Sequence, residues 1–255
     1  MTATPAGITY ADYLKLDRLL GAQQPLSGLH DEMLFIVIHQ TKELWMKQML
    51  HELELAVALV ASDSFAAAYK ALARISRIQS VMTLSWDVLS TLTPVDYLAF
   101  RDVLGTSSGF QSAQFREFEF RLGLKDPAYL QHYPQGSEAR GRLESALERP
   151  SLRDESHAAL ERAGFDLGDR SVAALAAAWL EVYRDAERWF DLYQLAEKLV
   201  DLDDALAAWR HKHVLTVERI IGNKPGTGGS AGAPYLRATL DKRAFPELWS
   251  LRTEL

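Results

Sequence analysis

HDEMLFIVIHQTKELWMKQMLHEL, residues 30–53, is the stretch that decides the fold. Its apolar residues recur at the three- and four-residue spacings of an α-helix, and no proline or glycine interrupts them. Two apolar stripes lie side by side on this helix. The first contains Leu34, Val37, Ile38, Thr41, Leu44 and Trp45, and the second contains Phe35, His39, Met46, Met49, Leu50 and Leu53. A helix this broadly apolar is expected to be central and packed on most sides.

The rest of the chain has the same helical period, and alternating patterns typical of strands are scarce. The sequence therefore predicts an all-α protein. One helix has a clear start and stop, with Thr93 as N-cap, Pro94 at the first helical position and Gly105 as terminator. The expected helices cover residues 10–20, 28–61, 63–92, 94–104, 110–123, 137–148, 151–163, 171–200 and 202–221.

The domain organisation follows from length and composition. The chain has 255 residues and 48% hydrophobic content, which is enough for one large core. We expect a single domain over residues 1–255. The stretch around 134–170 is rich in glycine, proline and charge, so it is expected to be a less core-like helical insertion. The tail after Gly222 contains NKPGTGGSAGAPYL and is expected to be a loop.

Composition and charge exclude several classes of function. The chain has no cysteine, so any metal must be held by nitrogen or oxygen. A net charge of −6 without clustered basic residues argues against a nucleic-acid partner. The apolar runs are too short to span a bilayer, so no membrane association is expected. The N-terminus lacks a signal-peptide pattern, and the expected location is the cytoplasm.

Two histidines are expected to face the core. His39 lies within the second stripe of the helix expected over 28–61, and His213 shares a stripe with Leu206 and Trp209 in residues 201–222. A buried imidazole is hydrogen-bonded, metal-bound or energetically costly. Two ordinary core histidines would explain the pattern. A di-iron or di-manganese site would need Glu-x-x-His pairs, which the chain lacks. Haem needs only one axial imidazole and a large apolar cavity.

Two further features could bind a ligand. Tyr97 and Arg101 are four residues apart and therefore neighbours on one helical face, where they could hold a carboxylate or form a surface pair. GTGGS, residues 226–230, could be a flexible tail. Its glycines would also allow it to approach a bound ligand closely, with Thr227 contributing a hydroxyl.

The sequence closely resembles the tryptophan 2,3-dioxygenase family, and the match runs through most of the chain. It is carried by YADYLKLDRLLGAQQP (10–25), HDEMLFIVIHQTKELWMKQMLHEL (30–53), LTPVDYLAFRDVLGTSSGFQSAQFR (92–116), WRHKHVLTVERIIG (209–222) and KPGTGGSAG (224–232). This resemblance implies an all-α helical bundle with a haem pocket between long central helices, related to indoleamine 2,3-dioxygenase-like folds. Two departures are Ile38, where a polar residue is expected, and the 134–170 region, which has little to match.

The resemblance implies roles for individual residues at the reaction centre. His213 matches the axial ligand of the haem iron, and His39 matches the distal, catalytic histidine near the indole nitrogen. Phe35 matches the aromatic side chain that packs on the substrate ring. Tyr97 and Arg101 match the pair that faces the substrate carboxylate.

Other matched positions surround this centre. Thr227 matches the residue that meets the substrate ammonium, and Trp86, Ser108 and Gly109 are expected around the haem. A segment with Tyr10, Tyr13 and Leu14 resembles one that completes the pocket of a neighbouring subunit. The resemblance thus implies a homo-oligomer, expected to be a tetramer.

The implied activity is a haem-dependent dioxygenase reaction. Both atoms of O2 would be inserted across the indole C2–C3 bond of L-tryptophan to give N-formylkynurenine, the first step of the kynurenine pathway. The implied cofactor is haem b, ferrous in the active state. Two alternatives are a haem protein of the same fold that binds an indole or amine without cleaving this bond, and a non-enzymatic helical binding module.

Overall fold

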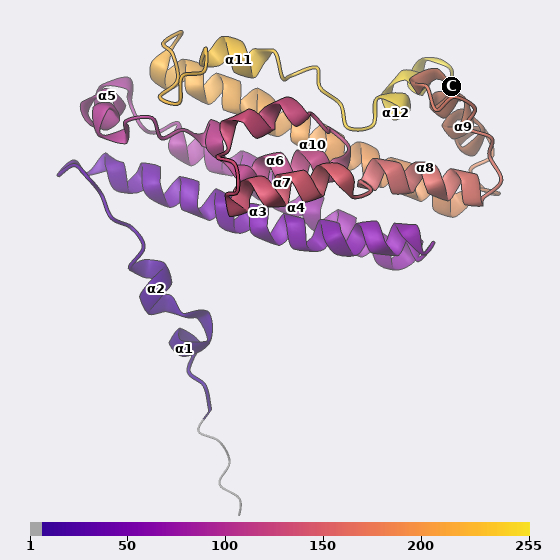
Figure 1. The fold of residues 1–255 in the computed structure, drawn as a ribbon, viewed down its shortest axis with the longest axis horizontal. Coiled ribbons are helices and arrows are strands. Elements are labelled where there is room, and N and C mark those ends of the chain that lie inside the picture. Colours follow the sequence, from indigo (N-terminus) through magenta and orange to yellow (C-terminus); the bar gives the residue numbers. More distant parts are fainter. Residues whose placement is uncertain (1–6) are drawn as a thin grey trace, which may run out of the picture.

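The computed structural model describes residues 7–255, and the regular elements in this range are helices. Residues 1–6, at the start of the expected domain, lie outside the described residues. The longest helices are α3 (Asp31–Ala61), α4 (Phe65–Leu89) and α10 (Phe190–Ile221). They run along the body of the molecule, and α4 packs against both α3 and α10 (Figure 1). The all-α prediction is confirmed over these residues.

Shorter helices cover the two ends of this bundle. α5 lies at one end, whereas α8, α9 and α12 gather at the other (Figure 1). The short elements after α4 have the bounds α5 (Pro94–Phe100), η1 (Arg101–Leu104), η2 (Gly109–Gln111), α6 (Ala113–Leu122), η3 (Pro127–His132), α7 (Glu138–Glu148), α8 (Leu152–Arg162), α9 (Val172–Arg184), α11 (Ala233–Arg237), α12 (Pro246–Ser250) and η4 (Leu251–Thr253).

The start and stop signals around α5 are confirmed. The Thr93 side chain accepts a hydrogen bond from the backbone N–H of Asp96, and Pro94 occupies the first turn. Gly105 ends the following 3-10 turn with φ of 54°, a left-handed conformation that glycine adopts without strain. The segment therefore changes from α5 to η1 at Arg101.

Two predicted helix boundaries are wrong. The helix expected over 10–20 is divided into α1 (Tyr10–Leu14) and α2 (Leu16–Leu20) by Lys15, whose φ is 53°. The break expected near residue 201 lies instead at 185–189, between α9 and α10. α10 continues through residue 201 because its buried leucines keep a helical spacing on both sides. These are Leu192, Leu195, Leu199, Leu202 and Leu206.

Buried charge also supports α10 at this point. Asp203 is 1% exposed, and its carboxylate accepts hydrogen bonds from the backbone N–H groups of Ala244 and Phe245 and from the indole of Trp249. The acidic run DLDD (201–204) thus does not end the helix, and its Asp203 binds the C-terminal tail through hydrogen bonds. The tail expected to be a loop contains the short helices α11 and α12.

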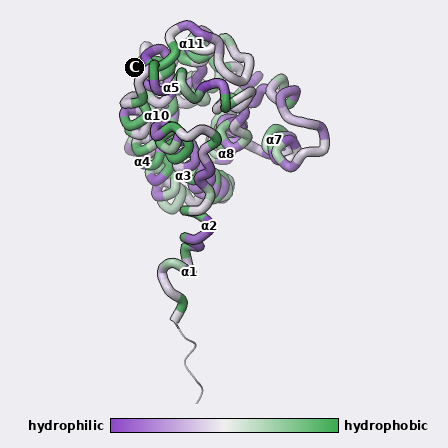
Figure 2. The backbone as a smooth tube through the Cα atoms, turned by 90° about the vertical axis from the view of Figure 1, so that its left-hand side faces the viewer, coloured by the Kyte–Doolittle hydropathy of each residue, from purple (hydrophilic) through white to green (hydrophobic). Residues whose placement is uncertain are grey.

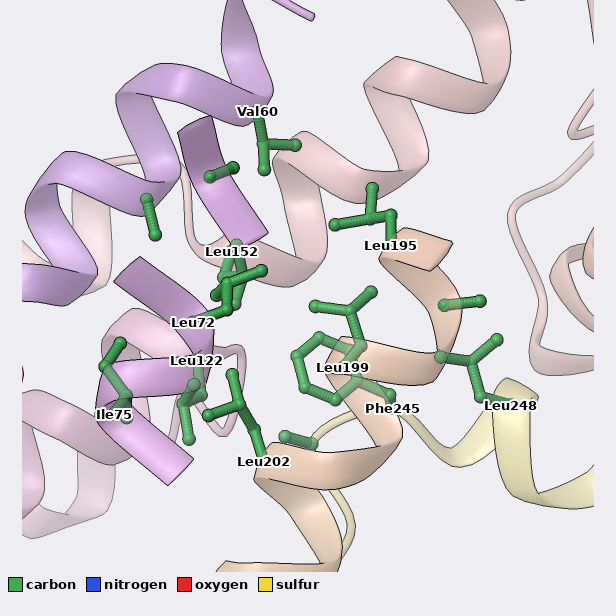
Figure 3. Packing of buried hydrophobic residues seen from close by; sticks show 14 of the residues in the cluster. Val60, Leu72, Ile75, Leu122, Leu152, Leu195, Leu199, Leu202, Phe245 and Leu248 are labelled. Carbon is green, nitrogen blue, oxygen red and sulfur yellow. The ribbon is translucent and has the colours of Figure 1, made fainter. Parts of the chain in front are cut away.

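Apolar side chains gather in separate clusters. The main core lies where α4, α8, α10 and the tail meet, and it includes Leu72, Leu152, Leu199 and Phe245 (Figure 3). A second cluster lies at the α5 end of the bundle and receives side chains from α3, α4, α5 and α10. Its buried members are Ile38, Trp86, Leu89, Leu92, Tyr97, Phe100 and Ile220. The second cluster contains several of the residues expected in the functional site.

The stretch 134–170 divides into two parts in the structure. α7 packs on α6 and η3 around Phe120 and Leu143, and it stands apart from the bundle in Figure 2. α8 packs on α3, and its Leu152 and Leu160 are fully buried in the main core. The single domain with a helical insertion around 134–170 stays a prediction.

The first apolar stripe of α3 is not covered as expected. Leu44 and Trp45 are 49% and 41% exposed, and on the adjacent helix α4 Leu84 is 63% exposed. α1 and α2 extend away from the body (Figures 1 and 2). The prediction that α3 is packed on most sides is wrong for a single copy of the chain. Among the described helices, none is long and apolar enough to cross a membrane.

Candidate functional site

His39 faces the second cluster from α3, next to Phe35. The two ring centroids are 4.2 Å apart, and Nδ1 of His39 lies 2.7 Å from the backbone carbonyl of Phe35. A carbonyl oxygen can only accept, so Nδ1 carries the proton and Nε2 presents a lone pair. Burial lowers the pKa of His39 to about 4, against a smaller opposing effect of the carbonyl contact. The imidazole is therefore neutral near neutral pH.

His213 enters the same end of the bundle from α10. Its imidazole stacks on the indole of Trp86 at a centroid distance of 4.3 Å and an interplanar angle of 13°. Trp209 contacts it from a tilted position at 5.2 Å. The pKa of His213 is lowered to about 3, chiefly by burial and to a smaller extent by the nearby Lys42 and His39. Stacking engages the face of the ring, so the nitrogen lone pair in the ring plane stays available to a metal.

A residue that the sequence interpretation overlooked also lies here. Lys42, on α3, is 5% exposed, and its Nζ lies 2.9 Å from the centroid of the Trp86 ring. Burial lowers the pKa of Lys42 to about 6. Its position three residues after His39, on the same side of a helix, was the available sequence signal.

Tyr97 and Arg101, the expected carboxylate clamp, lie next to Phe35 through the Tyr97 ring. The rings of Phe35 and Tyr97 are 5.9 Å apart, and Phe100 completes an aromatic group with edge contacts to both. Burial raises the pKa of Tyr97, and the nearby Arg101 partly offsets this by charge and by a hydrogen bond to the hydroxyl. Tyr97 and Arg101 are thus neighbours in space as well as in the helical pattern.

The glycine loop is folded against this clamp. The guanidinium of Arg101 donates to the carbonyl of Pro225, and the hydroxyl of Thr227 donates to the carbonyl of Ser107. Gly228 lies so close to Ser108 that a Cβ added to it would be 2.6 Å from the Cβ of Ser108. GTGGS is therefore a turn packed on the α5 side of the site and not a free tail. Because Gly228 has no side chain, its backbone can approach Ser108 this closely.

The structure brings some of the expected residues together and not others. His39, Phe35, Trp86, Tyr97 and His213 meet at one end of the bundle. The glycine loop, which carries Thr227, packs against Ser108, and Arg101 contacts Pro225 just before it. Gly109 begins η2 just beyond Ser108. Tyr10, Tyr13 and Leu14 lie on α1, exposed and away from the body (Figure 1).

The carboxylates that a di-iron site would need on α3 have other partners. Glu32 accepts hydrogen bonds from Leu26 and Ser27, Glu43 accepts one from Gln114, and Glu52 forms an ion pair with Arg74. Within residues 7–255, no group of three or more His, Cys, Asp or Glu side chains is arranged to hold a metal ion.

Comparison with known proteins assigns the chain to a family. A family model described as tryptophan 2,3-dioxygenase matches residues 1–166 and 166–255. The tryptophan 2,3-dioxygenase of Caulobacter vibrioides is 62% identical, over 97% of this chain and 98% of its own length. Those of Bacillus thuringiensis subsp. konkukian and a Polaromonas species are each 52% identical over 97% of this chain, with 93% and 88% of their lengths covered. With near-complete coverage on both sides, the chain belongs to the tryptophan 2,3-dioxygenase family.

Proposed function

We propose that this chain is a haem-dependent enzyme that opens the indole ring of L-tryptophan with O2 to give N-formylkynurenine, at the start of the kynurenine pathway. Its family membership supports the reaction. The observation that carries the proposal is the meeting of two neutral histidines, His39 and His213, with an aromatic and cationic clamp at one end of the bundle.

The residues present fit a haem. His213 offers a neutral imidazole nitrogen, which is the form that binds iron. Three buried nitrogens around it, in Lys42, Trp86 and Trp209, have no hydrogen-bond partner among the described residues. Unsatisfied buried polar atoms are rare in native proteins and mark places where a ligand or water completes the structure. His213 would hold the iron, and the apolar side chains of the second cluster would wall the porphyrin.

His39 is suited to accept a hydrogen bond. Its Nδ1–H donates to the Phe35 carbonyl, so Nε2 can accept from the indole N–H of the substrate. A pKa of about 4 makes this imidazole a very weak base, far too weak to remove the indole proton completely. We therefore assign His39 the role of orienting the indole and sharing its proton.

The clamp would set the orientation of the amino acid. Arg101 provides a planar, two-pronged donor for the substrate carboxylate, and the Tyr97 hydroxyl adds a third donor beside it. The Thr227 hydroxyl oxygen can accept a hydrogen bond from the substrate ammonium while the hydroxyl itself donates to the Ser107 carbonyl. Phe35 would pack on the indole ring. Because both ends of the substrate are fixed, the C2–C3 bond is held in one position.

A bound haem supplies the oxygen chemistry. The protein supplies position and exclusion of water: the aromatic side chains of Phe35, Tyr97 and Phe100 line the substrate side, and the glycine loop covers it. In a dry site the contacts of Arg101 and His39 with the substrate are stronger than they would be in water.

The exposed N-terminal helices are best explained by a partner subunit. α1 and α2 have five residues each, too few to be stable alone, and Tyr10 and Tyr13 are 76% and 72% exposed. We propose that this segment, with Leu14, completes the pocket of a neighbouring copy within a homotetramer. The uncovered apolar stripe on α3 is available for contacts between subunits.

The decisive experiment supplies L-tryptophan and O2 to the reduced, haem-loaded protein and records N-formylkynurenine absorbance. The expected result is product formation that requires both substrates. The exposed Lys47→Gln variant, on the same helix, is the matched control and should react like the wild type. Haem-loaded protein that leaves L-tryptophan unchanged would contradict the proposed function.

A further inference from the structure

Lys42 has no role in the function proposed above, although it lies within the same site. Its amine is at 2.9 Å from the Trp86 ring centroid, and Trp86 in turn stacks on His213. The side chain comes from the helix that carries His39, one turn further along. A lysine amine is therefore buried close to the two histidines that define the site.

No group of the described chain neutralises this amine. Lys42 Nζ has no hydrogen-bond partner. The nearest acidic side chains in the sequence have other partners. Glu43, next to Lys42 on α3, accepts a hydrogen bond from Gln114, and Asp87, next to Trp86 on α4, forms an ion pair with Lys212. The titratable groups that face Lys42 are His39 and His213, which supply no negative charge. The indole face of Trp86 gives a cation–π contact, which is weaker than an ion pair with a carboxylate.

A buried ammonium without an anion is destabilising, so a protein that keeps one inside a ligand site usually pairs it with an anionic ligand. The haem of the proposed function carries two carboxylates on its propionate side chains. Arg101 is not free to serve them, because the proposed function places it on the substrate carboxylate. Lys42 is therefore the buried basic side chain that remains to pair with a carboxylate of the porphyrin.

We propose that Lys42 is the counter-ion of a haem propionate, and that it makes this site selective for a porphyrin with free carboxylates. This inference rests on the proposed function, since it takes haem as the cofactor. It adds a binding residue that acts on the periphery of the cofactor, separate from the iron ligand His213. The ammonium would leave the face of Trp86 for the carboxylate.

The test compares two cofactors with the same porphyrin ring and different charge: the ester replaces each carboxylate by a neutral methyl ester. Haemin and haemin dimethyl ester are titrated into haem-free protein in the same buffer, and dissociation constants are read from the Soret band. We expect the wild type to bind haemin at least about tenfold more tightly than the ester, because a buried charge pair is lost with the ester. Lys42→Gln should weaken haemin binding by a similar factor and bind both forms alike.

Two variants control for indirect effects. Lys42→Arg keeps the charge and should retain the preference for haemin, whereas Lys47→Gln removes an exposed lysine from the same helix and should match the wild type. A Lys42→Gln protein that still prefers haemin to the ester as strongly as the wild type overturns the inference and leaves the proposed function intact. A wild-type protein that binds neither form overturns the proposed function itself. Helical circular dichroism confirms that each variant is folded.

Discussion

The buried amine of Lys42 makes a strong prediction for the haem-free protein. Burial lowers its pKa from 10.5 to about 6, so folding removes a proton that the unfolded chain holds. Between these two pKa values the unfolded state binds more protons, and the free energy of unfolding therefore rises with pH. Replacing Lys42 by methionine removes this cost and keeps an unbranched side chain of similar length over Trp86.

The magnitude follows from the pKa values. Near neutral pH the cost of deprotonating Lys42 is ~5 kcal/mol, from a difference of ~3.5 pH units at ~1.4 kcal/mol each. A lysine side chain can lower this cost by turning its amine toward water at the expense of packing. We therefore expect Lys42→Met to stabilise the haem-free protein by about 2–5 kcal/mol near neutral pH, and the gain to shrink by up to ~1.4 kcal/mol per pH unit toward pH ~10.

Urea denaturation of the haem-free protein, followed by circular dichroism at one protein concentration and several pH values, measures this gain. In the folded protein His39 and His213, with pKa values of about 4 and 3, stay neutral in this range, and their titration in the unfolded chain is common to both proteins and cancels in the comparison. Lys47→Met, at an exposed position, should change the free energy of unfolding by less than about 0.5 kcal/mol. A Lys42→Met gain that is absent, or that stays constant as the pH rises, would refute the reasoning.

Four further predictions concern the site and the assembly. His213→Ala should abolish the Soret band of the purified, haem-supplied protein, because no other residue is assigned to the iron. His39→Ala should keep the Soret band and part of the turnover, and complete inactivity with haem and substrate bound would show that His39 does more than orient the indole. Arg101→Ala should weaken recognition of L-tryptophan by about 2–5 kcal/mol, measured as kcat/KM, and an unchanged value would remove Arg101 from the clamp. Deleting residues 1–20 should raise KM for L-tryptophan, and light scattering of the same sample shows whether it still forms the proposed homotetramer.

The local pattern of the sequence was sufficient for the helices that carry the site. Helical period is set by neighbours three and four residues apart, so it predicted α3 and the inward direction of His39 and His213 without tertiary information. The capping signals around Thr93 and Gly105 likewise predicted a helix over 94–104 that carries Tyr97 and Arg101; in the structure Tyr97 lies on α5, and Arg101 begins η1. The catalytic roles came from resemblance to a family, because period and spacing alone left both ordinary core histidines and a haem site open.

Tertiary structure decided what the pattern could not. The break between α9 and α10 at 185–189 contains no proline or glycine, and α10 continues through an acidic run because Asp203 is satisfied by the distant tail. Lys42 reads as a polar residue in the sequence, and its burial depends on Trp86, which comes from another helix. The physical reason is the same in each case: local spacing fixes which face a side chain occupies, whereas burial and charge compensation depend on which remote segment packs against that face.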